Sequence, residues 1–369
     1  MKGFKKSWTP VHKWAGLIFG VILTIICATG AVLSFEKELL PWSIREIYFH
    51  KKTDGKTIKM EDLVKRLEQD ASVKSIVYPA DPARNWVVTF ANAPEKEVYV
   101  NPYTGQIVGT FTYKGSFFSV VREIHRFLLM GKAGRLITGT SSLVFIILLL
   151  SGVILRIPAS LKRIPALFRF DWKGNTFRKT FNLHVVLGLY AFLFLLVMSA
   201  TGPFWSFEWY NRGLSALFGI PATTSKRSSQ PPAEEGVKTL SPSEFSLIED
   251  KLSSFSAVQS DWKEIRVILP ASSENNFTFA VIPTKQIHGR QSDTYTWQLT
   301  TGALVKESVF KTKPLKETFR MWVFAVHTGS WAGWFGKLIY ALAALIGASL
   351  PITGYILWWK KRRITKKRR

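Results

Sequence analysis

Long apolar runs alternate with longer mixed segments along this chain of 369 residues. Each run is close to the roughly 20 residues that a helix needs to cross a bilayer. Buried helices of soluble proteins seldom extend this far without a charge, so the pattern predicts four transmembrane helices surrounded by membrane lipid. The runs occupy 14–35, 136–155, 183–206 and 337–359.

The first run also has the features of a cleaved secretion signal, because basic residues precede it and small residues stand at 28–31. It closely repeats the third run, however, and cleavage would remove His12. We therefore expect it to stay in the protein as a membrane span.

The two mixed segments, 36–135 and 207–336, each predict a small α+β domain. In each segment a helical pattern precedes four short runs whose residues predict strands. Ser241 and Glu244 have the spacing of a capping box before the second helical pattern. The polar, proline-rich stretch within 221–240 predicts a linker or lid.

The chain repeats itself, and histidines stand at matching places in the two copies. His12 and His184 open apolar runs that align without gaps at an offset of 172 residues. His125 and His327 align at an offset of 202 residues. The repeat predicts two helix–domain–helix units, with one histidine at the head of each spanning helix.

The net charge of +25 is concentrated in three segments. With four crossings these segments share one side of the membrane, and the positive-inside rule places that side and both termini in the cytoplasm. The charge then indicates topology, and we expect no nucleic-acid partner. The segments are the N-terminus at 1–13, the loop at 156–182 and the tail at 360–369.

The histidines are the best candidates for cofactor ligands. The only cysteine, Cys27, lies inside the first predicted span, and the C-x-x-C-H motif of covalently attached haem is absent. A haem supplies four nitrogens of its own and needs just two axial ligands, so paired histidines predict non-covalent haem b. Two histidines without a nearby carboxylate or thiolate are too few for structural zinc.

Helix direction decides which histidines meet. The first and third spans run outward, so His12 and His184 are expected near the cytoplasmic face. The second and fourth run inward, so His125 and His327 are expected near the outer face. This predicts two bis-histidine sites, one in each leaflet, whose iron ligands are these four residues.

Small and basic residues near the histidines fit this prediction. Gly16 and Gly188 follow their histidines by one helical turn and are expected to leave room for a flat porphyrin. Arg135 and Lys337 flank the outer pair and are expected to bind the haem propionates. Lys13 and Arg178 flank the inner pair, where ordinary interfacial anchoring is the simpler interpretation for the lysine.

Further glycines recur at eighteen-residue intervals along the spans, which is five full turns of helix. They are expected to leave gaps for haem at both levels. Close helix–helix packing, which also favours small residues in membranes, explains them equally well. They are Gly30, Gly134, Gly152, Gly202, Gly336 and Gly354.

Several features together resemble a known family. The helix, the strands and the turn at 101–105 (Asn-Pro-Tyr-Thr-Gly) are similar to the PepSY domain. Two such domains interleaved with four helices and four histidines resemble the PepSY-associated transmembrane proteins of bacteria, a group that includes inner-membrane siderophore reductases. The second domain departs from the turn motif, because Gln298 and Leu299 stand where the first domain has Asn101 and Pro102.

These observations predict a di-haem b-type membrane oxidoreductase. It would pass electrons from a cytoplasmic donor or a quinol to an extracytoplasmic acceptor, without a catalytic side chain of its own. The resemblance implies that the acceptor is a ferric siderophore or another iron chelate, and that the protein is a reductase of the bacterial cytoplasmic membrane.

Two other classes of function are also considered. PepSY domains resemble protease propeptides, so the chain is alternatively a non-enzymatic membrane protein that regulates peptidases or envelope assembly. A transporter is less favoured, because the repeats are parallel and the spans lack intramembrane charges.

Overall fold

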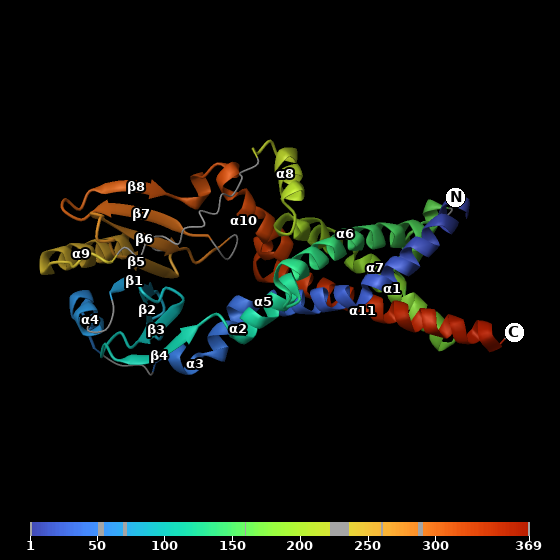
Figure 1. Cartoon of the computed structure of the whole chain (residues 1–369), viewed down its shortest axis with the longest axis horizontal. Helices are drawn as coiled ribbons and strands as arrows, with labels where there is room; N and C mark the ends of the chain where they lie inside the picture. The colour runs from blue at the N-terminus through green and yellow to red at the C-terminus, as the bar shows by residue number, and fades with distance from the viewer. Residues whose placement is uncertain are drawn as a thin grey trace. The chain divides into compact units, whose positions relative to one another are not determined.

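A computed structural model describes the chain as two compact units (Figure 1). The helical unit contains Met1–Glu36, Phe117–Thr223 and Trp322–Arg369, and the sheet unit contains Lys37–Ser116 and Thr224–Met321. His288 and most of the linker within 221–240 lie outside the described residues. The structure describes 2–50, 55–68, 72–158, 160–221, 236–259, 261–286 and 291–367.

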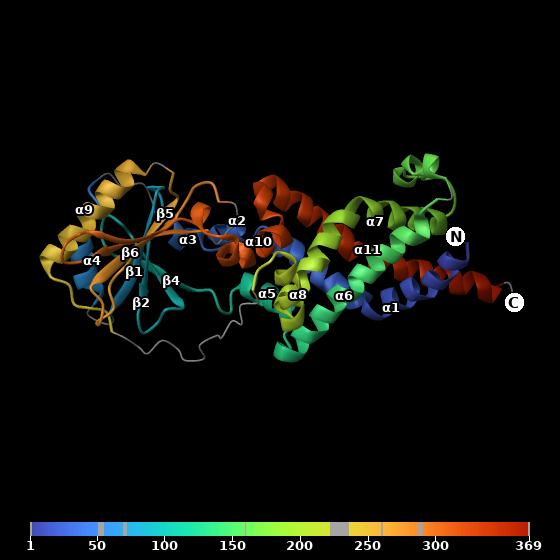
Figure 2. The same cartoon turned by 90° about the horizontal axis from the view of Figure 1, so that it is seen from above.

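The helical unit confirms the four predicted membrane-spanning helices. The long apolar helices are α1, α6, α7 and α11. The shorter α5 precedes α6, α8 follows α7, and α10 precedes α11. The start of α1 and the end of α11 lie at the same end of this unit (Figures 1 and 2). The bounds are α1 Lys2–Leu33, α5 Phe117–Phe127, α6 Gly131–Arg156, α7 Thr176–Thr201, α8 Glu208–Leu217, α10 Leu315–Thr328 and α11 Gly333–Lys367.

The spanning helices pack around an apolar core. Both α1 and α7 contact α6 and α11, so the two copies of the repeat interlock. Leu23 of α1 and Leu195 of α7 are almost fully buried, and Ala343 of α11 lets the helices approach closely. The longer helices extend the predicted spans into polar segments at the end where the chain termini lie.

The structure corrects the expected position of two histidines. His125 and His327 lie on α5 and α10, which precede the spanning helices α6 and α11. The turn before α6 is tight, because a Cβ atom on Gly134 would stand 1.6 Å from the carbonyl oxygen of Phe127. A Cβ atom on Gly336 would likewise stand 2.2 Å from the carbonyl oxygen of Gly329. These two glycines therefore close a helix–helix turn, and do not leave a gap for haem.

The sheet unit joins the two expected domains into one. Its eight strands form a single antiparallel sheet in the order β4-β3-β2-β1-β5-β6-β7-β8. The strands of the first half are β1 Val73–Pro79, β2 Trp86–Phe90, β3 Lys96–Val100 and β4 Ile107–Thr112. Those of the second half are β5 Glu264–Ile268, β6 Asn276–Ile282, β7 Asp293–Gln298 and β8 Leu304–Ser308.

Strands β1 and β5 pair directly across the junction of the two halves. The register runs from Ser75 opposite Ile268 to Pro79 opposite Glu264. Each four-stranded half alone would expose one of these strands as an edge with unpaired backbone groups, and the pairing removes both edges. The sheet thus repeats the two-fold organisation of the sequence.

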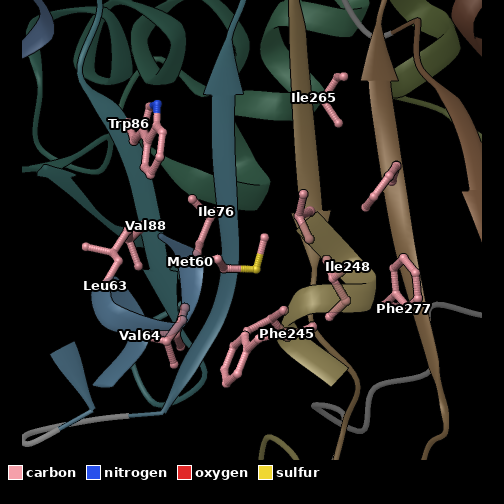
Figure 3. Packing of buried hydrophobic residues seen from close by; sticks show 14 of the residues in the cluster. Met60, Leu63, Val64, Ile76, Trp86, Val88, Phe245, Ile248, Ile265 and Phe277 are labelled. Carbon is pink, nitrogen blue, oxygen red and sulfur yellow. The ribbon is translucent and has the colours of Figure 1, made fainter. Parts of the chain in front are cut away.

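One hydrophobic core serves both halves of the sheet. Helices α4 (Met60–Leu67) and α9 (Pro242–Val258) lie side by side on one face (Figures 1 and 2). Met60 of α4 and Ile248 of α9 are buried together with Phe277 of β6 (Figure 3). The expected capping box at Ser241 and Glu244 is present at the start of α9. The remaining short helices of this unit are α2 Glu36–Ser43 and α3 Arg45–Tyr48.

A buried ion pair ties the two halves together, and its loss has a predictable cost. Arg84, before β2, donates to Glu264 of β5 at 2.6 Å, and its guanidinium lies over the ring of Tyr48. Arg84→Ala leaves the carboxylate without its partner, so we expect the sheet unit to lose roughly 3 kcal/mol of stability. Hydrogen exchange of the β1 and β5 amides measures this loss. Lys65→Ala, which removes the exposed Lys65–Glu61 pair, is the control and should change exchange little.

Candidate functional site

The helical unit brings the four predicted histidines together as two pairs. The ring centroids of His12 and His184 lie 6.4 Å apart, and those of His125 and His327 also lie 6.4 Å apart. The ring planes are steeply inclined, at 90° in the first pair and 62° in the second. These are the two pairings that helix direction predicts.

The pairs occupy two levels along the spanning helices. His12 lies on α1, and the ring of His125 packs against Gly30, eighteen residues further along the same helix. At 1.5 Å per residue the two levels are about 27 Å apart along α1. The His12–His184 pair lies at the end of the unit that holds both chain termini, and the His125–His327 pair lies towards the other end.

Each histidine ring packs against a glycine of a neighbouring helix. A Cβ atom built on these glycines would stand between 3.1 and 3.9 Å from the Cε1 atom of the ring. The glycines expected to leave gaps for haem therefore give room to a histidine. The contacts are His12 with Gly152, His184 with Gly354, His125 with Gly30 and His327 with Gly202.

The residue before each of these glycines carries a hydroxyl that contacts the same ring. The distances from histidine Nδ1 are 2.8 Å in three of the four cases and 3.1 Å in the case of His125. Sequence reasoning did not identify these residues as part of the site, although the repeated Thr-Gly dipeptides were a visible signal. The contacts are His12 with Ser151, His184 with Thr353, His125 with Thr29 and His327 with Thr201.

A large cavity opens beside the His12–His184 pair. Its volume is about 1470 Å³, and both histidines line it. Gly16 and Gly188 line it too, and a Cβ atom on either would only reach ordinary contact distance from a leucine. The wall is otherwise largely apolar and aromatic, so the cavity suits a large apolar body.

The wall of this cavity also carries positive charge. Arg156 is half-buried there, and its Nε atom is buried without a hydrogen-bond partner. Lys13 and Arg362 line the same cavity. A buried guanidinium nitrogen without a partner favours an anionic ligand group. From the sequence, Arg156 was interpreted only as a topology signal, and Arg178 was expected beside the His12–His184 pair. In the structure Arg178 is exposed and forms an ion pair with Asp171 at 3.0 Å.

An aromatic side chain lies beside the His125–His327 pair. The ring of Trp205 lies 5.5 Å from that of His327. Burial lowers the pKa of His125 and lowers that of His327 to about 4, so both rings are neutral and able to bind a metal at neutral pH. Arg135 is exposed at the start of α6, and Lys337 is half-buried at the start of α11.

In the part of the chain that the structure describes, the candidate metal ligands of the helical unit come together as pairs. Among the described residues, no group of three or more histidines, cysteines or carboxylates is placed to hold a metal ion. A bare ion such as zinc normally takes four ligands, and two imidazoles supply half of them. A cofactor that brings its own equatorial ligands fits two histidines.

Comparison with known proteins places nearly the whole chain in one family. Residues 9–361 match the model of the PepSY-associated TM region. No match to a curated protein was found.

Proposed function

The chain belongs to the family defined by the PepSY-associated TM region, and from the geometry of its paired histidines we propose that it is a di-haem b-type membrane oxidoreductase. The observation that carries this proposal is the equal spacing of the two histidine pairs. The four histidines lie at two levels, and each ring is largely buried between a hydroxyl group and a glycine. Packing of the helices alone does not require histidines at these positions.

The spacing fits two imidazoles on opposite sides of one iron atom. A metal–imidazole bond of about 2 Å, with roughly 1 Å more from nitrogen to ring centre on each side, puts the ring centres about 6 Å apart. The observed separation in both pairs is 6.4 Å. The porphyrin supplies the remaining four nitrogens.

The cavity beside His12 and His184 supports the same proposal. Its apolar wall suits a porphyrin body, and Gly16 and Gly188 keep side chains away from it. Arg156 and Lys13 would bind the anionic propionates. For the other pair, Arg135 and Lys337 remain the proposed propionate partners.

A bound haem supplies one-electron chemistry, and the chain determines where that chemistry takes place. The two histidine pairs would hold a haem at each of two levels, and apolar side chains fill the core between the levels. Basic residues at 2–6, 156–179 and 360–367 favour a cytoplasmic position for the end with both termini. The His12–His184 level would then receive electrons from a cytoplasmic donor or a quinol, and the His125–His327 level would release them outside.

The proposed acceptor is a ferric siderophore or another iron chelate, which makes the protein a reductase of the bacterial cytoplasmic membrane. The resemblance to a group of membrane proteins that includes siderophore reductases supports this choice. The segments of the sheet unit follow α1 and α7 in the chain, and this unit would offer the acceptor a folded surface.

Reoxidation by a ferric chelate tests the acceptor. The purified full chain is reduced with dithionite, freed of reductant and mixed with a ferric siderophore while its absorbance is recorded. We expect rapid return of the oxidised spectrum. The gallium complex of the same siderophore, which matches iron(III) in charge and size but accepts no electron, is the control. A reduced spectrum that persists with the ferric complex would exclude this acceptor and leave the di-haem assignment standing.

A further inference from the structure

Four hydroxyl side chains are placed alike around the four histidines. We propose that Ser151, Thr353, Thr29 and Thr201 are positioning residues, which fix the tautomer of their histidine so that Nε2 is the iron ligand. This inference rests on the proposed haem function and deepens it. It concerns residues that do not touch the iron themselves.

The proton positions follow from the contacts of two histidines. Nδ1 of His12 lies 3.1 Å from the carbonyl oxygen of Leu148, and Nδ1 of His125 lies 2.9 Å from that of Ile26. A carbonyl oxygen can only accept a hydrogen bond, so Nδ1 of both rings carries the proton. The lone pair then resides on Nε2, the nitrogen left for a metal.

The hydroxyls have their own hydrogen already in use. Ser151 donates to the carbonyl of Leu148 at 2.9 Å, in the preceding turn of its own helix. Thr29, Thr201 and Thr353 each donate to a carbonyl three or four residues earlier, at 2.7 to 3.1 Å. The hydroxyl oxygen is therefore an acceptor towards histidine, and again favours the proton on Nδ1. The same tautomer follows for His184 and His327.

The glycine after each hydroxyl completes the arrangement. The Cε1 atom of His125 lies 3.1 Å from the place where a Cβ atom of Gly30 would be, so a larger residue would push the ring away. The hydroxyl and the glycine together hold one edge of the ring against a helix. Neutral metal-binding histidines commonly need this kind of support from a hydrogen-bond acceptor at the second nitrogen.

Helices α1 and α7 each carry a Thr-Gly dipeptide that contacts a histidine at one level. Each of them also carries a histidine of its own at the other level. On α1, His12 lies at one end and Thr29-Gly30 lies seventeen residues later. On α7, His184 and Thr201-Gly202 have the same interval. Each of these helices therefore supplies an iron ligand at one level and positions a ligand at the other.

The test compares two threonines on α1 in the full chain. Thr29→Val keeps the shape of the side chain and removes the hydroxyl that faces His125. Thr24→Val is the matched control, because the Thr24 hydroxyl lies on the same helix and donates to the carbonyl oxygen of Ala348 instead of facing a histidine. We expect haem affinity at the His125–His327 site to fall 10- to 100-fold in Thr29→Val alone. Thr29→Ser should restore it.

A second readout follows the histidine without haem. Nitrogen-15 chemical shifts of labelled histidine in the haem-free chain report the tautomer directly. We expect the Nδ1–H form for His125 in the unaltered chain and in Thr24→Val. In Thr29→Val the Ile26 carbonyl remains as an acceptor for Nδ1, so we expect the Nδ1–H form to lose part of its population and not to disappear. His125 in the Nε2–H form in the unaltered chain would overturn the proposal.

The two readouts separate this inference from the haem function. Equal haem affinity in Thr29→Val and Thr24→Val, in a chain that binds two haems, would overturn the positioning role and leave the haem function intact. A chain that takes up no haem would overturn the haem function, and with it the role assigned here to Nε2 as an iron ligand.

Discussion

Replacing either histidine of one pair with alanine is expected to lower the haem content from two per chain to one. Each iron in the proposed sites has two protein ligands, and loss of one leaves a single axial bond to hold the cofactor. His12→Ala and His184→Ala should remove the same haem, and His125→Ala and His327→Ala the other. Haem is measured as the pyridine haemochrome against protein concentration.

The control for these variants is His50→Ala, which alters a histidine of the sheet unit and should leave two haems in place. Circular dichroism shows whether each variant keeps its helices. Loss of the same haem in His12→Ala and His327→Ala would contradict the pairing, because the structure places these residues at different levels.

The second large effect concerns the direction of electron transfer. In sealed vesicles with the sheet unit outside, the reduced chain should be reoxidised by a ferric chelate that cannot cross the membrane. His327→Ala should abolish this reaction, since the remaining site lies at the other level. In His184→Ala, the chemically reduced protein should still pass one electron from the His125–His327 site to the chelate. Continued electron transfer from a donor inside the vesicle should be lost.

Protease access to the sheet unit identifies the vesicles with the required orientation. A permeant ferric chelate is the control, because it should reoxidise the His327→Ala variant from the other side. Equal rates for the impermeant chelate in His327→Ala and in the unaltered chain would contradict the proposed direction.

The sequence was sufficient for the spans and for the pairing of the histidines. Long apolar runs have few alternatives to membrane helices, and the repeat joined to helix direction placed His12 with His184. These inferences succeeded because they depend on local composition and on the number of crossings, both of which can be read along the chain.

The turns before α6 and α11 could not be foreseen in the same way. An apolar run does not reveal that Gly134 lies against the carbonyl of Phe127. The sequence therefore predicted His125 at the head of the spanning helix and did not indicate the separate helix α5. Glycine has several uses in membrane helices, and only the three-dimensional contact distinguishes a tight turn from a gap for a cofactor.

The single sheet and the hydroxyl contacts depend on long-range register. Strand β1 pairs with β5 across nearly two hundred residues of sequence, and strand patterns alone do not name a partner. The contact of Thr353 with His184 depends on which side of α11 faces α7, and the sequence does not give that orientation. Arg156 looked like an ordinary basic residue at a membrane boundary until the structure placed it in the cavity wall.

Haem content and metal content, measured together, show whether each histidine pair holds a haem. The full chain is purified in detergent with haem supplied during expression, and its spectrum, pyridine haemochrome and metal content are recorded on the same sample. We expect a Soret band, a b-type haemochrome and two haems per chain. A folded, helical protein that takes up no haem, or that holds zinc in its place, would contradict it.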